Sequence, residues 1–176
     1  MTTWHSFGRY ALLFAAACAS ACGYHVAGRG ERLPTDVKTI AVPTFTNQTK
    51  RFRIEQQFTA AVVREFIEAT HFKVVTEPDS ADAVVEGTVK NIATGVIAFN
   101  QNTGAATALQ VVVTADVRLV DQHSHKVLFS NPRYTFREEY QISQNNSQLF
   151  EEEGPALDRL AQDFAHTLVT DILENF

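Results

Sequence analysis

The chain has 176 residues and carries 15 lysines and arginines against 20 aspartates and glutamates, a formal net charge of −5 at pH 7. A net-acidic chain without a basic tract is a poor candidate for binding nucleic acid, so we expect no nucleic-acid partner. Both cysteines, Cys18 and Cys22, fall within the first 22 residues. The rest of the chain has no thiol for a disulfide, a metal site or a nucleophile, and its length suits one domain of ordinary size.

The first 22 residues have the pattern of a bacterial lipoprotein signal peptide. After Arg9, an apolar run of 12 residues spans 10–21, whereas a helix needs about 20 residues to cross a bilayer. The run ends in three small residues followed by Cys22. This pattern predicts removal of residues 1–21 and attachment of a diacylglycerol to Cys22. Cys18 is a second candidate, and we favour Cys22 because cleavage there leaves a polar start.

Residues 22–36 contain several glycines and are predicted to form a lipidated tether, with a single domain at 37–176. Gly23 follows the predicted lipidated cysteine. An aspartate there is the usual retention signal of inner-membrane lipoproteins, so glycine favours the outer membrane. No later stretch has the length of a membrane-spanning helix. Attachment would therefore depend on the lipids, and several acyl chains anchor a protein more stably than one.

The first half of the domain combines short strands with one helix. A strand is predicted at 37–42, where Pro43 ends it, and a polar turn at 44–50. Residues 53–70 repeat apolar side chains at helical spacing. The predicted apolar face of this helix consists of Ile54, Phe58, Ala61, Val62, Phe66 and Ala69. A second short strand is predicted at 72–75, followed by a turn at 77–80.

Two long strands, 83–99 and 109–119, are predicted next, joined by a loop at 100–106 that contains a hairpin signal. The first strand would exceed about 50 Å if it were straight, so we expect it to bend, with Gly95 as the expected place. Its apolar alternation runs through Val85, Gly87 and Val89, then Ala93, Ile97 and Phe99. The second strand directs every odd-numbered residue from Leu109 to Leu119 to one face, which is predicted to be buried.

A turn at 121–126 leads to a strand at 127–140 whose apolar side chains change phase. Apolar residues are odd-numbered up to Phe129 and even-numbered from Tyr134. A bulge at Asn131 and Pro132 would bring both sets to the same side of the sheet. After a polar connection at 143–148, a helix is predicted from about Pro155. Its apolar stripe consists of Leu157, Leu160, Ala161, Phe164, Leu168, Ile172 and Leu173.

Two amphipathic helices and an antiparallel-rich sheet predict an α+β fold. The expected architecture is a two-layer α/β sandwich, with two helices packed on a mostly antiparallel sheet. Each helix stripe needs an apolar sheet face to pack against, and the hairpin of long strands supplies that face.

No group of residues predicts catalysis, a metal site or a cofactor. His123 and His125 lie two residues apart on a predicted turn and lack a third ligand nearby, so a solvated turn is expected. Acidic residues gather at Glu138, Glu139 and 151–153. The paired carboxylates of a hydrolase are one interpretation. The preferred one is a charged strand end and a helix N-terminus, where anions complement the helix dipole.

Basic residues are spread along the predicted sheet, at Lys90, Arg118, Lys126, Arg133 and Arg137. A solvated sheet face is a sufficient explanation for them. A functional interpretation is that lysines and arginines beside apolar sheet surface hold a phosphorylated lipid by charge.

Several motifs occur in order along the mature chain. They are Cys22-Gly-Tyr-His-Val-Ala27, Lys38-Thr-Ile-Ala-Val-Pro-Thr-Phe-Thr-Asn47, Arg53-Ile-Glu-Gln56, Ala81-Asp-Ala-Val-Val-Glu-Gly-Thr-Val89, Tyr134-Thr-Phe-Arg-Glu-Glu-Tyr-Gln-Ile-Ser143 and the C-terminal helix. Together they resemble the LptE family of lipopolysaccharide-assembly lipoproteins. The resemblance implies a two-helix, four-stranded domain anchored in the outer membrane, which plugs the β-barrel protein LptD and supports its folding. It also implies lipopolysaccharide binding and transport to the cell surface, without catalysis.

Only Cys22 is carried over from the family as a functional residue. The family's lipopolysaccharide-binding basic positions match no motif here, so Arg118, Lys90 and Arg133 are candidates on charge alone. An alternative remains open, because residues 40–45 also resemble the first strand of CsgG- or TolB-like periplasmic domains. That resemblance would imply a lipoprotein acting as a binding scaffold in secretion or the cell envelope.

Overall fold

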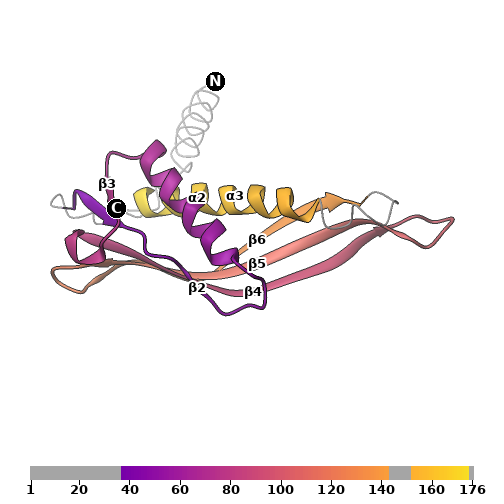
Figure 1. Cartoon of the computed structure of the whole chain (residues 1–176), viewed down its shortest axis with the longest axis horizontal. Coiled ribbons are helices and arrows are strands. Elements are labelled where there is room, and N and C mark those ends of the chain that lie inside the picture. The colour runs from indigo at the N-terminus through magenta and orange to yellow at the C-terminus, as the bar shows by residue number, and fades with distance from the viewer. Residues whose placement is uncertain (1–36, 143–151, 175–176) are drawn as a thin grey trace, which may run out of the picture.

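Two helices cover one face of a long sheet in the computed structural model, which describes residues 37–142 and 152–174 (Figure 1). The elements are β1 (Thr39–Ala41), β2 (Thr46–Asn47), α2 (Ile54–Ala69), β3 (Lys73–Val75), the 3-10 helix η1 (Pro78–Ser80), β4 (Ala83–Phe99), β5 (Ala106–Asp121), β6 (Val127–Gln141) and α3 (Glu153–Glu174). Both predicted helices and every predicted strand are present. The predicted lipidation at Cys22, the tether at 22–36 and the connection at 143–148 lie outside the described residues.

The sheet contains six strands within the described residues, in the order β3-β1-β4-β5-β6, with β2 also paired to β4. The expectation of a mostly antiparallel four-stranded sheet is therefore only roughly right. The three long strands are antiparallel, but β1 runs parallel to both β3 and β4, and β2 runs parallel to β4. Strand β2 lies inside the segment predicted as a polar turn. It is extended because it pairs with β4, a contact that the local sequence does not encode.

The predicted alternation of β4 is correct in its first half and wrong in its second. A register shift follows Val89, so that Ile92 pairs with Val113 on the face that the helices cover. Ala93 therefore lies on the opposite face, not in the core. The irregularities of β4 fall after Val89 and between residues 96 and 99, whereas Gly95 pairs in register with Gln110, so no bulge lies at Gly95. An inserted residue exchanges the two faces of a strand, and the apolar pattern alone did not locate it.

The alternation of β5 and the bulge of β6 are confirmed. The odd-numbered residues from Val111 to Leu119 are buried. The register of β6 shifts between Asn131, which pairs with Val117, and Tyr134, which pairs with Ala115. This shift places the even-numbered aromatic residues of β6 on the helix side of the sheet, as the change of phase predicts.

An aromatic cluster around Phe164 joins α3, α2 and the sheet. The ring of Phe164 lies 5.0 Å from that of Phe58 on α2 and 5.4 Å from that of Phe136 on β6, measured between centroids. Phe45 and Tyr134 meet the same ring edge-on at 6.3 Å and 6.0 Å. Such T-shaped and tilted contacts are favoured geometries for aromatic rings. The core therefore lies between the two helices and one face of the sheet, and neither α2 nor α3 covers the other face.

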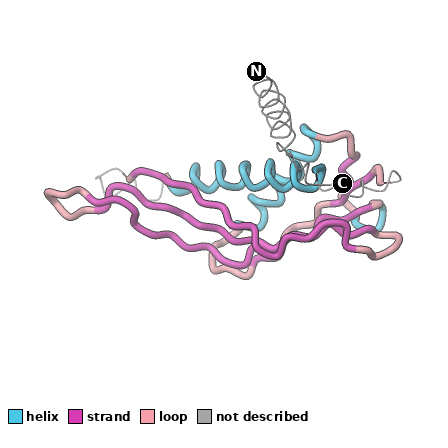
Figure 2. Tube along the Cα trace, turned by 180° about the vertical axis from the view of Figure 1, so that it is seen from behind, coloured by secondary structure: helices cyan, strands magenta, loops and turns pink. Residues whose placement is uncertain are grey.

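The β4–β5 hairpin extends beyond the helices as an arm, shown from behind in Figure 2. Residues 91–115, here called the hairpin arm, run from the helix-covered part of the sheet out to the tip of this hairpin, and no charged side chain occurs among them. Val96, Ile97 and Phe99 on this arm are 44%, 45% and 61% exposed. Among the helices described, none has both the length and the apolar character needed to span a membrane.

Candidate binding site

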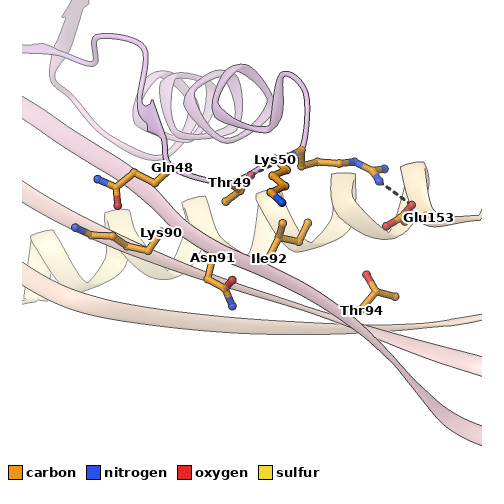
Figure 3. Close-up of a pocket in the computed structure, with 9 residues that line it drawn as sticks. Gln48, Thr49, Lys50, Lys90, Asn91, Ile92, Thr94 and Glu153 are labelled. Atoms are coloured by element: carbon orange, nitrogen blue, oxygen red, sulfur yellow. Dashed lines mark hydrogen bonds and ion pairs between the residues drawn. The ribbon is translucent and has the colours of Figure 1, made fainter.

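A surface pocket lies where β2 ends its pairing with the edge of β4. Figure 3 shows it between the loop after β2, strand β4 and the first turn of α3. Its volume is about 510 Å³. The lining residues are Gln48, Thr49, Lys50, Arg51, Lys90, Asn91, Ile92, Thr94 and Glu153. Together with the adjoining sheet face that the helices leave uncovered, this pocket forms the candidate site.

The loop that walls the pocket is fixed by the side chain of Asn47. Its Oδ1 accepts hydrogen bonds from the backbone N and the Oγ1 of Thr49, each at 2.8 Å. Its Nδ2 donates to the carbonyl of Arg51 and to Oε2 of Glu55 on α2, each at 2.8 Å. Asparagine suits such turns because its short side chain reaches neighbouring backbone groups. These bonds therefore fix the conformation of the loop and attach it to α2.

An ion pair between Arg51 and Glu153 joins this loop to α3. Arg51 Nη1 lies 2.9 Å from Glu153 Oε2, and the Glu153 side chain is only 12% exposed. Both charges of this ion pair also act on the hydroxyl of Tyr140. Burial raises the pKa of Tyr140, the charge of Glu153 raises it further, and the charge of Arg51 lowers it. A mostly buried carboxylate needs a cationic partner to offset its lost hydration. Because its charge is already paired with Glu153, Arg51 acts chiefly as part of the pocket wall.

The other two lining cations differ in their partners. Lys90 Nζ lies 3.5 Å from Asp116 Oδ2 on β5. Lys50 is exposed and forms no ion pair with the residues that the structure describes. The lining as a whole has three cations and one anion. A negatively charged group is therefore the ligand that this charge balance favours.

The uncovered sheet face, here called the outer face, carries the cations predicted from the sequence. Arg118 pairs in register with Glu86, and its Nη2 lies 2.8 Å from Glu86 Oε2. Lys90 contacts Asp116, two residues before Arg118 on β5. Arg133 is exposed and lies in the β6 bulge opposite the same part of β5. The structure brings the three predicted residues to one region, where Lys90 and Arg118 are already ion-paired.

Sequence reasoning missed Lys50 and Arg51 as site residues. The one local signal was the basic run Lys50-Arg51-Phe-Arg53 after a polar turn. Their position beside Lys90 depends on the pairing of β2 with β4, which joins two segments far apart in the sequence. That tertiary contact could not be read from periodicity.

The structure directs Glu138 and Glu139, two of the carboxylates considered for catalysis, away from each other. Glu138 and Glu139 are neighbours in β6, so their side chains point to opposite faces of the sheet. Glu138 Oε1 accepts a hydrogen bond from Arg159 Nε at 2.6 Å. His123 and His125 are exposed on the predicted turn. Within residues 37–142 and 152–174, no three metal-ligating side chains are grouped to hold an ion.

Three solved structures share this fold at low sequence identity. The uncharacterized lipoprotein B of Nitrosomonas europaea has a TM-score of 0.57 and 14% identity, covering 86% of this chain and 90% of its own. A protein of Xanthomonas campestris has a TM-score of 0.52 and 12% identity, with 82% and 90% covered. A PelC dodecamer from Paraburkholderia phytofirmans has a TM-score of 0.51 and 14% identity, with 78% and 87% covered. At these identities the likeness shows the fold alone.

Comparison with family models gives the assignment. No curated protein sequence matches the chain. The LptE model, described as lipopolysaccharide-assembly, matches residues 37–172. That range runs from two residues before β1 through nearly all of α3, and it confirms the resemblance that the sequence motifs carry. The chain therefore belongs to the LptE family, whose description is lipopolysaccharide-assembly.

Proposed function

We propose that this protein is an outer-membrane lipoprotein that plugs the LptD β-barrel, helps it to assemble and takes part in lipopolysaccharide transport to the cell surface. The observation that carries the proposal is the family match over residues 37–172. The hairpin arm supports it, because an uncharged extension with exposed apolar side chains suits a surface that is covered in use. The lining of the pocket contains no histidine, cysteine or pair of carboxylates, which fits binding better than catalysis.

Lipopolysaccharide is the proposed ligand of the outer face. Its phosphates would be held by Lys90, Arg118 and Arg133, since the guanidinium fork matches phosphate geometry and lysine supplies a point charge. Two of these cations are paired with Asp116 and Glu86 in the structure. Exposed ion pairs of this kind contribute only about 0–1 kcal/mol each. Exchanging such a carboxylate for a phosphate would therefore cost little free energy.

A mild-detergent pull-down of the mature lipoprotein, followed by mass spectrometry, tests the proposal. We expect a large LptD-type β-barrel protein to co-purify, and depletion of the lipoprotein to reduce lipopolysaccharide at the cell surface. A normal outer leaflet after depletion would contradict the transport role. Recovery of secretion-channel or envelope-scaffold components without LptD would instead favour the CsgG- or TolB-like alternative.

A further inference from the structure

One edge of β4 has no strand beside it from residue 91 to residue 99 in the described part of the chain. The last backbone bond between the β2 segment and this edge runs from Gln48 N to the carbonyl of Val89, at 2.9 Å. Beyond that bond, β4 pairs with β5 alone. Ile92 and Thr94 on this edge also line the pocket, so open space adjoins them (Figure 3).

The register fixes which backbone groups face the open edge. Ile142 N donates to the carbonyl of Thr107 at 3.0 Å, so the odd-numbered residues 107–115 of β5 direct their backbone groups to β6 and the even-numbered ones to β4. The β4 partners of those even-numbered residues are Asn91, Ala93 and Gly95. The residues that therefore present their N–H and C=O groups to the open edge are Ile92, Thr94 and Val96.

The open edges of β4 and β6 differ in how well they are protected against pairing with a further strand. Proteins shield exposed edges with charged side chains and prolines, which discourage a further strand. Strand β6 carries these devices along its length: Pro132, Arg133, Arg137, Glu138 and Glu139. The open part of β4 has none, and it exposes large apolar side chains near its end. The β6 edge is thus suited to solvent, whereas the β4 edge is suited to a partner.

We propose that an extended, uncharged segment of the β-barrel partner adds to β4 as a further strand along residues 91–99, an inference that rests on the function proposed above. Backbone hydrogen bonds to Ile92, Thr94 and Val96 supply its affinity, as in other cases of strand addition. An uncharged segment fits because a charged side chain set against this edge would lose hydration without a partner. Lys50, at the pocket end of the edge, would face an acidic residue of the partner that lies just beyond the uncharged segment.

Amide hydrogen exchange of the mature lipoprotein, measured alone and in its purified complex with the barrel, tests the added strand. We expect the amides of Ile92, Thr94 and Val96 to exchange rapidly in the free chain and to slow about tenfold or more in the complex. The amides of residues 91, 93 and 95 serve as an internal reference, because they bond to β5 in both states. Rapid exchange of the three edge amides in the complex would overturn the proposal.

Amide exchange in the free chain tests whether another segment of this chain or a second copy, instead of the barrel, covers this edge. Slow exchange at the three edge amides in the free chain, independent of its concentration, would show that another segment of this chain covers them. Protection that increases with concentration would show that a second copy does so. Either result overturns the proposed occupant.

Matched proline variants test the same contact by affinity. Thr94→Pro removes an N–H that faces the open β4 edge, and Thr135→Pro makes the same change on the open edge of β6. Proline is tolerated at edge positions whose N–H faces solvent, so both variants should fold. We expect Thr94→Pro to lower the affinity for the barrel about tenfold, and Thr135→Pro to leave it unchanged. Equal affinities in the two variants would contradict strand addition.

Charge variants separate this inference from the proposed function. Thr94→Lys, which leaves the backbone donor in place, should also weaken the complex, and it replaces the proline variant if that one fails to fold. Lys50→Glu should weaken the complex, whereas Lys73→Glu on β3 should not. An unchanged affinity in Lys50→Glu would contradict the proposal that Lys50 faces an acidic residue of the partner. A wild-type chain that never recovers a barrel contradicts the proposed function itself. A barrel recovered equally by wild type, Thr94→Pro and Thr94→Lys contradicts only the added strand.

Discussion

The ring of Phe45 packs directly against the backbone of Gly87. A Cβ added at Gly87 would lie 2.5 Å from three ring carbons of Phe45, closer than real Cβ atoms approach. Phe45 is 3% exposed, and its backbone N donates to Thr59 Oγ1 on α2 at 2.9 Å. The ring is therefore held between α2, α3 and β4, and β4 needs a residue without a side chain at this point.

Gly87→Ala should destabilise the domain. The ring of Phe45 can move away from the new methyl group only by displacing other core side chains, so we expect a loss of about 1–3 kcal/mol in the free energy of unfolding. Urea denaturation followed by circular dichroism measures it. Gly95→Ala is the matched control, since nothing lies within 4 Å of a Cβ there. Equal denaturation midpoints for the two variants would show that the core absorbs the methyl group without strain.

Asp82 connects the start of β4 to β1 through its carboxylate. Its Oδ2 accepts hydrogen bonds from the backbone N of Lys38 at 2.9 Å and from the N and Oγ1 of Thr39 at 2.8 Å and 2.7 Å. The bond from the Lys38 backbone, followed by those from Thr39, holds the pKa of Asp82 below its ordinary value. Bonds to the ionised form favour that form in the folded state.

The lowered pKa of Asp82 predicts a stability that depends on pH. A carboxyl whose pKa is lower in the folded state stabilises the fold above its unfolded pKa, and this stability is lost as the pH falls through the folded pKa. We expect wild type to be more stable than Asp82→Asn at pH 7, and the difference to shrink below about pH 4. Urea unfolding across this range measures the difference. Asp79→Asn, at an exposed position, is the control; a difference for Asp82→Asn that persists unchanged at pH 3 would refute this assignment.

The ion pair between Arg51 and Glu153 predicts a measurable coupling between the pocket loop and α3. In a double-mutant cycle with Arg51→Met and Glu153→Gln, we expect a coupling of about 1 kcal/mol, at the upper end for pairs with one exposed partner. Arg51→Met alone should cost more than Glu153→Gln alone, because it leaves a mostly buried carboxylate without its cation. Chemical denaturation of the four proteins gives the coupling. Arg118→Met with Glu86→Gln, a more exposed pair, should give a smaller value.

The elements that could be predicted are those whose pattern is local. The odd-numbered face of β5 and the stripes of α2 and α3 are long enough for their periods to be unambiguous, and nearly all of these residues are buried. Leu173 and Ala69, at the ends of the helix stripes, are exposed, although Ile172 beside Leu173 is fully buried. Strand β2 and the second half of β4 were not predicted correctly, since one depends on a tertiary pairing and the other on an inserted residue.

The candidate site could be predicted only in part for the same reason. Lys90, Arg118 and Arg133 were candidates on charge alone, and it is the pairing of β4 with β5 and of β5 with β6 that brings them to one region. Lys50 and Arg51 join Lys90 only because the short parallel strand β2 brings their loop to β4. The open edge of β4 is a property of sheet order, which alternating apolar residues do not determine.

Cys22→Ser should release the protein from the outer membrane without unfolding it. The proposed diacylglycerol on this cysteine supplies the attachment, and the domain at 37–176 needs no thiol in its core. Membrane fractionation together with the circular dichroism spectrum measures both effects. Cys18→Ser is the matched control and should leave the location unchanged. If Cys18→Ser releases the protein and Cys22→Ser does not, the lipid is attached to Cys18.

Arg118→Glu should weaken lipopolysaccharide binding if the outer face holds its phosphates. The change removes one charge-assisted contact and places two carboxylates, at positions 86 and 118, beside each other, so we expect affinity to fall about tenfold or more. Binding of purified lipopolysaccharide to the lipoprotein at low and at physiological salt measures the loss. Lys73→Glu makes the same change in net charge at an exposed position on β3, the strand at the far edge of the sheet, and it should bind like wild type. Equal losses in both variants would mean that binding responds to net charge alone, and no loss in Arg118→Glu would remove the outer face as the phosphate site.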